Sequence, residues 1–165
     1  SRYLDLLADV FLVRILRPWS NNLGKRLVKS PKVYLRDSGL LHALLNIKNI
    51  EELLSHPTVG GSWEGFIIEN IASCFNSSVN LWFYRTAAGA EIDLLIEFSP
   101  TKLIAIEIKR SLSPSISTGL RNAIDDLKPY KTFIVYPGDD CYKLNEQIEV
   151  ISLQKIMVYL LEQLV

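Results

Sequence analysis

Two neighbouring runs of residues, 90–96 and 103–109, alternate between apolar and polar side chains, and this pattern constrains the fold most strongly. Successive side chains of a β-strand point to opposite faces of its sheet. In the second run three isoleucines therefore share one face, while Glu107 and Lys109 share the other. The two runs are predicted to be β-strands that carry charged side chains on one face of a sheet.

In the first run Asp93 is expected to fall on the charged face. The opposite, apolar face is expected to carry Ile92, Leu94 and Ile96. If the two strands pair through the connection at 97–102, Asp93 converges with Glu107 and Lys109. Two carboxylates and an amine at one place suit a hydrated divalent metal ion and a polarised water molecule. The alternative is an ordinary charged ladder on a solvent-exposed face, in which each cross-strand pair contributes about 0.2–1 kcal/mol.

A predicted helix at 62–77 carries a further acid toward the sheet. At about 100° per residue, Glu64 falls in the middle of the apolar face of this helix, and Glu69 falls on the opposite, solvated side. That apolar face is made of Trp63, Ile67, Ile68, Ile71, Cys74 and Phe75. A buried Glu64 carboxylate costs several kcal/mol unless it is paired or bound to a metal. The alternative is that Glu64 lies near solvent at the helix start, where the helix dipole stabilises it.

The remaining periodicity predicts an α/β chain with a front unit at 1–47, a linker at 48–60 and a second unit at 61–165. The front unit combines helices with a basic β-hairpin, a pattern typical of the back half of a winged helix. Ser152 is expected to cap the last helix. The predicted strands are 10–16, 32–35, 81–86, 90–97, 102–109, 131–136 and 148–151, and the predicted helices are 3–8, 39–45, 62–77, 116–128 and 152–164.

The charges of the chain are unevenly distributed, although its net charge is zero. Residues 1–47 carry eight lysines and arginines against three acids, and residues 48–165 carry ten against fifteen. This asymmetry indicates different partners for the two parts, or else a chance distribution over solvated loops.

A basic turn in the first part is the candidate surface for nucleic acid. Trp19 in this turn is a candidate stacking side chain; the alternative is a solvated turn in which Trp19 packs locally. Phosphate contacts are predicted for Arg17, Lys25, Arg26, Lys29 and Lys32.

Several classes of protein are not expected from this sequence. No apolar run reaches the roughly 18 residues of a membrane span, and the N-terminus lacks the apolar core of a secretory signal. Cys74 and Cys141 are far apart, and the two histidines lack ligand spacing, so neither a disulfide framework nor a zinc site is expected. We therefore expect a reducing, cytoplasmic compartment and no membrane partner. The start at Ser1 suggests a trimmed fragment.

Short stretches of the chain occur in the order found in a known family. They are 29–40 (KSPKVYLRDSGL), 61–64 (GSWE), 84–86 (YRT) with 89–93 (GAEID), and 106–109 (IEIK). A helical acid, a hairpin Asp and then Glu-x-Lys resemble the PD-(D/E)XK nuclease-like superfamily. More narrowly, the chain is similar to a domain of unknown function that follows an AAA-type ATPase module in many bacterial and archaeal proteins.

This resemblance implies an α/β fold with a restriction-endonuclease-like αβββαβ core and a mixed sheet, preceded by a partial winged-helix segment. Glu64 would be the acid of the helix, and Lys109 would orient the attacking water. The metal ion, Mg²⁺ or Mn²⁺, would be bound by Asp93 and Glu107, with the carbonyl oxygen of Ile108 as a further ligand.

The implied function is metal-dependent hydrolysis of phosphodiester bonds in DNA, by a domain joined to an ATPase in the full-length protein. The sequence has no GxxxxGK(S/T) motif, so ATP binding through a P-loop is not expected here. The alternative is a non-catalytic module of the same fold that binds nucleic acid, or that regulates or assembles the linked ATPase.

Overall fold

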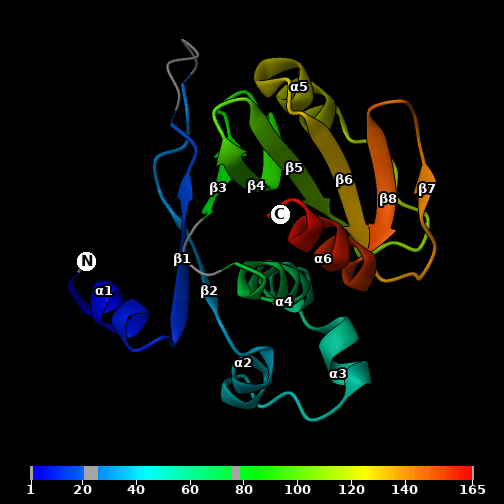
Figure 1. Cartoon of the computed structure of the whole chain (residues 1–165). Coiled ribbons are helices and arrows are strands. Elements are labelled where there is room, and N and C mark those ends of the chain that lie inside the picture. Colours follow the sequence, from blue (N-terminus) through cyan, green and yellow to red (C-terminus); the bar gives the residue numbers. More distant parts are fainter. Residues whose placement is uncertain (1, 21–25, 76–78, 165) are drawn as a thin grey trace.

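The computed structural model describes residues 2–20, 26–75 and 79–164 (Figure 1). Within these residues the chain forms one mixed eight-stranded sheet and six helices. The strands are β1 (Val13–Pro18), β2 (Lys32–Leu35), β3 (Asn80–Arg85), β4 (Glu91–Ser99), β5 (Lys102–Ile108), β6 (Lys131–Tyr136), β7 (Tyr142–Lys143) and β8 (Ile148–Ser152). The helices are α1 (Arg2–Asp9), α2 (Ser38–Leu44), α3 (Ile50–Ser55), α4 (Val59–Ser73), α5 (Thr118–Leu127) and α6 (Leu153–Glu162). None of these helices has both the length and the apolar character that crossing a membrane requires.

The strands follow the order β2-β1-β3-β4-β5-β6-β8-β7 across the sheet. The N-terminal hairpin of β1 and β2 belongs to this sheet because β1 runs parallel to β3, with Arg17 opposite Trp82. Strands β3, β4 and β5 are antiparallel neighbours, whereas β5, β6 and β8 run parallel. Parallel neighbours need a crossover connection, and α5 lies in the one between β5 and β6.

Each face of the central sheet packs against its own helices. On one face, α4 and α6 form a core with side chains such as Leu94, Ile104 and Phe133. On the other face, α5 packs against side chains such as Leu95 and Ala105. Figure 1 shows α4 and α6 together on the near side of the strands. Because both faces are covered, β5 and β6 are buried on both sides and read as almost continuous apolar runs.

Most of the predicted elements are present in the predicted order. The bounds of β2 and β6 are those expected from the sequence, and Ser152 caps α6 by accepting a hydrogen bond from the N–H of Lys155. The succession α4-β3-β4-β5-α5-β6 is the αβββαβ order expected for residues 61–165, and the mixed sheet is confirmed. The restriction-endonuclease-like assignment, the winged-helix assignment of residues 1–47 and the division into two units stay predictions.

The structure differs from the predicted elements most clearly in two segments, and it adds the short strand β7. The range 48–60, predicted to be a linker, contains α3 and the beginning of α4 at Val59. Asn49 caps α3 with its side chain, an N-terminal signal that the polar composition of this range concealed. The first strand begins at Val13 rather than at residue 10, because Phe11 has a φ of 59°, which an extended strand does not allow.

Glu69 of α4 attaches the N-terminal hairpin to the second part of the chain. Its carboxylate accepts hydrogen bonds from the guanidinium of Arg14 and, at 2.7 Å, from Nε of Arg36. The expectation that Glu69 is a solvated surface residue is therefore wrong, since only 18% of its side chain is exposed. Burial alone would raise the pKa of Glu69, but the hydrogen bonds from the two guanidinium groups hold it below its usual value.

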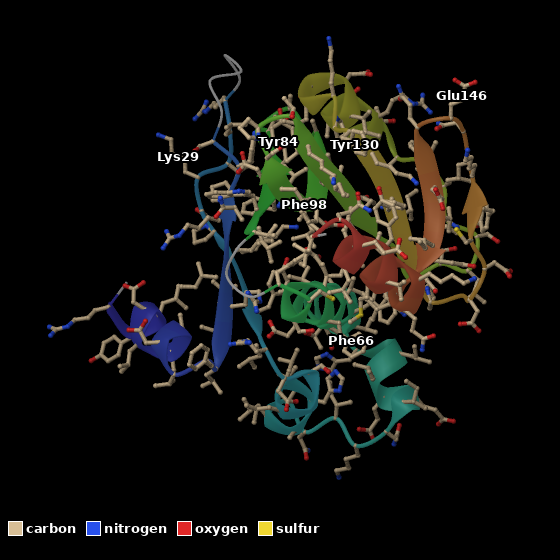
Figure 2. The ribbon with its side chains drawn as sticks, in the orientation of Figure 1. Lys29, Phe66, Tyr84, Phe98, Tyr130 and Glu146 are labelled. Carbon is tan, nitrogen blue, oxygen red and sulfur yellow. The ribbon has the colours of Figure 1, made fainter. Side chains whose placement is uncertain are left out.

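Glu69→Gln is expected to destabilise the protein by about 1–3 kcal/mol, because it leaves Arg14 and Arg36 half-buried without their charged partner. Urea unfolding measures this change, and hydrogen exchange of the amides in β1 should rise more than that of the amides in β6. Glu146→Gln is the matched control, because Glu146 is exposed at the opposite end of the sheet from the hairpin (Figure 2). Unchanged stability of the Glu69→Gln variant would contradict this role.

Candidate functional site

A pocket of about 540 Å³ lies beside the ends of β4 and β5. Its walls come from the beginning of α4, the turn between β3 and β4, the two strands and the beginning of α5. Its charged lining residues are Glu64, Glu91, Asp93, Glu107, Lys109 and Arg110. The structure thus brings all four residues predicted to be catalytic to one pocket.

A β-bulge determines where Asp93 lies in the pocket. In β4 two residues, Asp93 and Leu94, lie opposite the single residue Phe83 of β3. Ile92 consequently packs on the α5 side of the sheet and Leu94 on the α4 side. The prediction that Ile92 and Leu94 share a face is wrong, because the alternation shifts at the bulge. Oδ2 of Asp93 accepts a 2.9 Å hydrogen bond from the N–H of Ile108 at the end of β5.

Glu107 is the most buried acid of the pocket, with 7% of its side chain exposed. Its Oε1 accepts a 2.6 Å hydrogen bond from the ammonium of Lys109, and its Oε2 has no hydrogen-bond partner among the described residues. Burial and the nearby charge of Asp93 raise the pKa of Glu107 to about 7, although Lys109 acts in the opposite direction. A buried carboxylate oxygen without a partner is costly until a ligand or a water molecule satisfies it.

Helix α4 directs Glu64 into the pocket, as its helical pattern predicted. Because α4 begins at Val59, Glu64 lies beyond the first turn, and the alternative that it sits at the helix start is wrong. Oε1 of Glu64 accepts hydrogen bonds from the ammonium of Lys32 at 2.8 Å and from the hydroxyl of Tyr34. Burial and the charge of Glu64 raise the pKa of Tyr34, so this hydroxyl stays protonated and remains a donor.

Lys32, at the beginning of β2, lies among the acids rather than on an exposed basic surface. Its Nζ is 2.8 Å from Glu64, 3.3 Å from Asp93 and 3.3 Å from Glu91, and 19% of its side chain is exposed. Burial alone would lower the pKa of Lys32, but the three carboxylates outweigh burial and hold it above its usual value. Burial and the charge of Glu64 raise the pKa of Asp93, and Lys32 partly offsets this effect.

The other residues predicted to contact phosphates lie in β1 (Arg17) and in the connection between β1 and β2. Arg17, Arg26 and Lys29 are exposed, and Lys25 lies outside the described residues. Figure 2 shows Lys29 at the outer edge of the hairpin. Trp19 packs edge-on against a second tryptophan in β3, with ring centroids 6.0 Å apart, so it is packed locally. Contact of these basic residues with nucleic acid stays a prediction.

Two glycines and a tryptophan shape the walls of the pocket. Gly89 has a φ of +88° in the turn between β3 and β4, and a Cβ added to Gly119 of α5 would lie 2.7 Å from the carbonyl oxygen of Gly89. The helix can approach this turn so closely because residue 119 has no side chain. Across the pocket, the indole N–H of Trp63 donates a 3.1 Å hydrogen bond to the carbonyl oxygen of Lys109, which holds the end of β5.

The donor set fits a divalent cation bound by two carboxylates. Mg²⁺ prefers carboxylate oxygens and retains several of its water molecules, so Asp93 and Glu107 can supply its protein ligands. The unpartnered Oε2 of Glu107 is the atom that such a cation would satisfy. No group of three or more His, Cys, Asp or Glu side chains within the described ranges is arranged to hold a metal ion. The carbonyl oxygen of Ile108 stays a predicted further ligand.

Comparison with protein families gives a match over most of the second part of the chain. Residues 59–156, more than half of the chain, match a family described as a domain of unknown function, DUF4143. The chain belongs to the DUF4143 family. A second family model, DUF8612, also described as a domain of unknown function, matches residues 1–51. Every acid of the pocket lies within the DUF4143 match, whereas Lys32 and Tyr34 lie in the DUF8612 match.

Two curated relatives of this DUF4143 chain are described as uncharacterized proteins. The proteins Mb2031c of Mycobacterium bovis and Rv2008c of Mycobacterium tuberculosis are each 42% identical to it over 156 residues. Each alignment covers 94% of this chain and 35% of the relative, so the chain spans about a third of the length of these relatives. Among solved structures, the chain is similar to one from an assembly of Thermococcus gammatolerans McrB AAA+ hexamers with bound McrC, with a TM-score of 0.43 and 8% sequence identity. That alignment covers 99% of this chain and 65% of the other.

Sequence reasoning missed Tyr34 as a hydrogen-bond partner of Glu64 and assigned Lys32 to another surface. A local signal was present, because Lys32 and Tyr34 are two positions apart in a strand and therefore face the same side. The partner of that side was not predictable from periodicity, since Lys32 and Glu64 are 32 positions apart.

The stability of the protein is expected to fall as the pH rises from about 4.5 to 7 because of Glu107. Its folded-state pKa of about 7 exceeds the usual value of 4.5, so the folded state keeps a proton that the unfolded state releases in this window. Between pH 5 and pH 8 the wild type should lose about 2–3 kcal/mol more than Glu107→Gln, which cannot release this proton. Urea unfolding at both pH values measures the difference. Parallel losses in the two proteins would show that Glu107 titrates normally.

Proposed function

We propose that this DUF4143 chain hydrolyses phosphodiester bonds of DNA in a reaction that depends on Mg²⁺ or Mn²⁺. The observation that carries this proposal is the buried, unpartnered Oε2 of Glu107, in a pocket that also contains Asp93 and Lys109. A buried carboxylate oxygen without a hydrogen-bond partner among the described residues favours the binding of a cation. The neighbouring lysine supplies the positive charge that a phosphoryl group requires.

The residues of the pocket have distinct roles in this reaction. Asp93 and Glu107 would hold the metal ion, which when bound supplies Lewis acidity and lowers the pKa of a bound water. Lys109 would orient the attacking water and stabilise the negative charge that develops on the phosphoryl oxygens. Its ammonium is already positioned by the 2.6 Å hydrogen bond to Glu107. Glu64, which lies on α4, is the remaining acid of the proposed site.

The rim of the pocket suits a phosphate backbone. Arg110 lines the pocket and is exposed, and 32% of the Lys109 side chain is exposed as well. Lys109 and Arg110 follow Glu107 by two and three positions, just beyond the end of β5. A phosphodiester that contacts Arg110 would therefore approach the pocket with its scissile phosphate near Lys109.

A second candidate function is non-catalytic, and the acidic balance of residues 48–165 favours it. An acidic surface repels DNA, so binding of nucleic acid would depend on the exposed residues Arg17, Arg26 and Lys29 of the N-terminal part. In this case the domain would bind nucleic acid, or would regulate or assemble an ATPase in the same full-length protein. Binding that weakens steeply with salt, without cleavage in any divalent metal, distinguishes this candidate from a nuclease.

Calorimetric titration of Mn²⁺ tests the metal site directly. The wild type should bind Mn²⁺ saturably, and Asp93→Asn should abolish this binding because one of the two carboxylate ligands is lost. Asp125→Asn is the matched control, since Asp125 is exposed on α5 outside the pocket. Equal Mn²⁺ binding by the wild type and a folded Asp93→Asn variant would refute the proposed site.

Cleavage of DNA tests the chemistry separately from metal binding. Lys109→Met should retain Mn²⁺ binding but lose at least 100-fold in the rate of plasmid cleavage, because the group that stabilises the developing charge is removed (about 2.7 kcal/mol or more). Arg121→Met is the control for the loss of one positive charge, because Arg121 is exposed on α5 outside the pocket. Full cleavage by the Lys109→Met variant would exclude the proposed role of Lys109.

A further inference from the structure

We propose that Lys32 is a built-in cation that limits this pocket to a single divalent metal ion. Its ammonium takes the position among Glu64, Glu91 and Asp93 that a second metal ion would otherwise occupy. Lys32 is thus a positioning residue for the proposed hydrolysis, which this inference deepens, and it comes from the N-terminal hairpin rather than from the part that matches DUF4143.

The distances around Lys32 are those of an ammonium and not of a metal ion. Its Nζ lies 2.8 Å from Glu64, 3.3 Å from Asp93 and 3.3 Å from Glu91. Carboxylate oxygens bind Mg²⁺ or Ca²⁺ at roughly 2.0–2.6 Å, so the three acids lie farther from the position of Nζ than ligands lie from a bound metal ion. Removing the ammonium would let them close around a divalent cation, because three half-buried carboxylates repel one another without one.

The acids of the pocket divide into two groups, one beside Lys109 and one around Lys32. Glu107 pairs with Lys109, and its second oxygen remains free for a metal ion. The other three acids share Lys32, and Glu91 has an additional contact, 3.6 Å, with the half-exposed Arg85. Asp93 contacts Lys32 and is also a proposed ligand of the metal ion, so it connects the metal position to the position of Lys32.

The main chain and a ring hold Lys32 in this position. Lys32 pairs with Leu16 in the β1–β2 ladder, which fixes its backbone. Its ammonium lies 5.4 Å from the ring centroid of Phe83, opposite the β4 bulge that carries Asp93. Tyr34, two residues further along the same strand, binds the same oxygen of Glu64. The hairpin therefore presents a donor pair to the acids rather than one mobile side chain.

The test is the stoichiometry of Mn²⁺ binding, measured by calorimetry on the wild type, Lys32→Met and Lys32→Arg. We expect one site in the wild type, two in Lys32→Met, and one in Lys32→Arg, which keeps the charge. Lys32→Met combined with Glu64→Gln should return to one site, because the second site then has only two carboxylates. An unchanged number of sites in a folded Lys32→Met variant would overturn the inference.

A measurement on the wild type covers the case in which Lys32→Met does not fold. The rate of reductive methylation of each lysine is followed by mass spectrometry with and without saturating Mn²⁺. Lys32 should react slowly in both conditions, because the metal binds beside it and does not displace it. A rise in the reactivity of Lys32 upon addition of Mn²⁺ would overturn the inference, since the metal would then compete for the same position.

The two proposals fail in different ways. No Mn²⁺ binding by the wild type with one site in Lys32→Met would refute the metal site of Asp93 and Glu107 and uphold the role of Lys32. One site in both proteins would uphold that metal site and refute the role of Lys32.

Discussion

The ion pairs between Lys32 and three carboxylates are the interaction on which the pocket depends. Glu64 lies on α4, whereas Glu91 and Asp93 lie on β4 of the sheet against which α4 packs. Burying these three acids together without a cation would cost several kcal/mol. The ammonium makes this arrangement possible and joins the N-terminal hairpin to the site. A residue 61 positions away from Asp93 along the chain thereby becomes part of its surroundings.

The same hairpin is held at a second point, where Arg14 and Arg36 bind Glu69 on α4. Together with Lys32, these residues explain part of the uneven charge of the chain by ion pairs within the protein. Part of the positive excess of residues 1–47 neutralises acids of residues 48–165 across the hairpin interface. Neither an external partner nor chance distribution over solvated loops is needed to explain these particular charges.

The proposed chemistry rests on the contrast between two acids of the pocket. Asp93 is satisfied by Lys32 and by the N–H of Ile108, whereas Glu107 keeps one buried oxygen without a partner in the described part of the chain. The unsatisfied oxygen of Glu107 marks the place for a ligand, and Asp93 lies in the same pocket. Lys109 lies next to that place, so a cation position and a phosphate-binding charge occur side by side.

The sequence by itself determined the local features: the strands at 32–35 and 131–136, the cap at Ser152, and the direction of Glu64 on its helix. Alternation along the strands also predicted that Asp93, Glu107 and Lys109 lie close together, although a bulge rather than alternation determines where Asp93 lies. Only the tertiary structure decided that a bulge turns Ile92 to the other face. It also decided that Lys32 pairs with Glu64 and that Glu69 pairs with Arg36. The bulge depends on how β3 and β4 pair, and the ion pairs of Lys32 and Glu69 join residues at least 30 positions apart; no periodicity in the sequence records which distant charges meet.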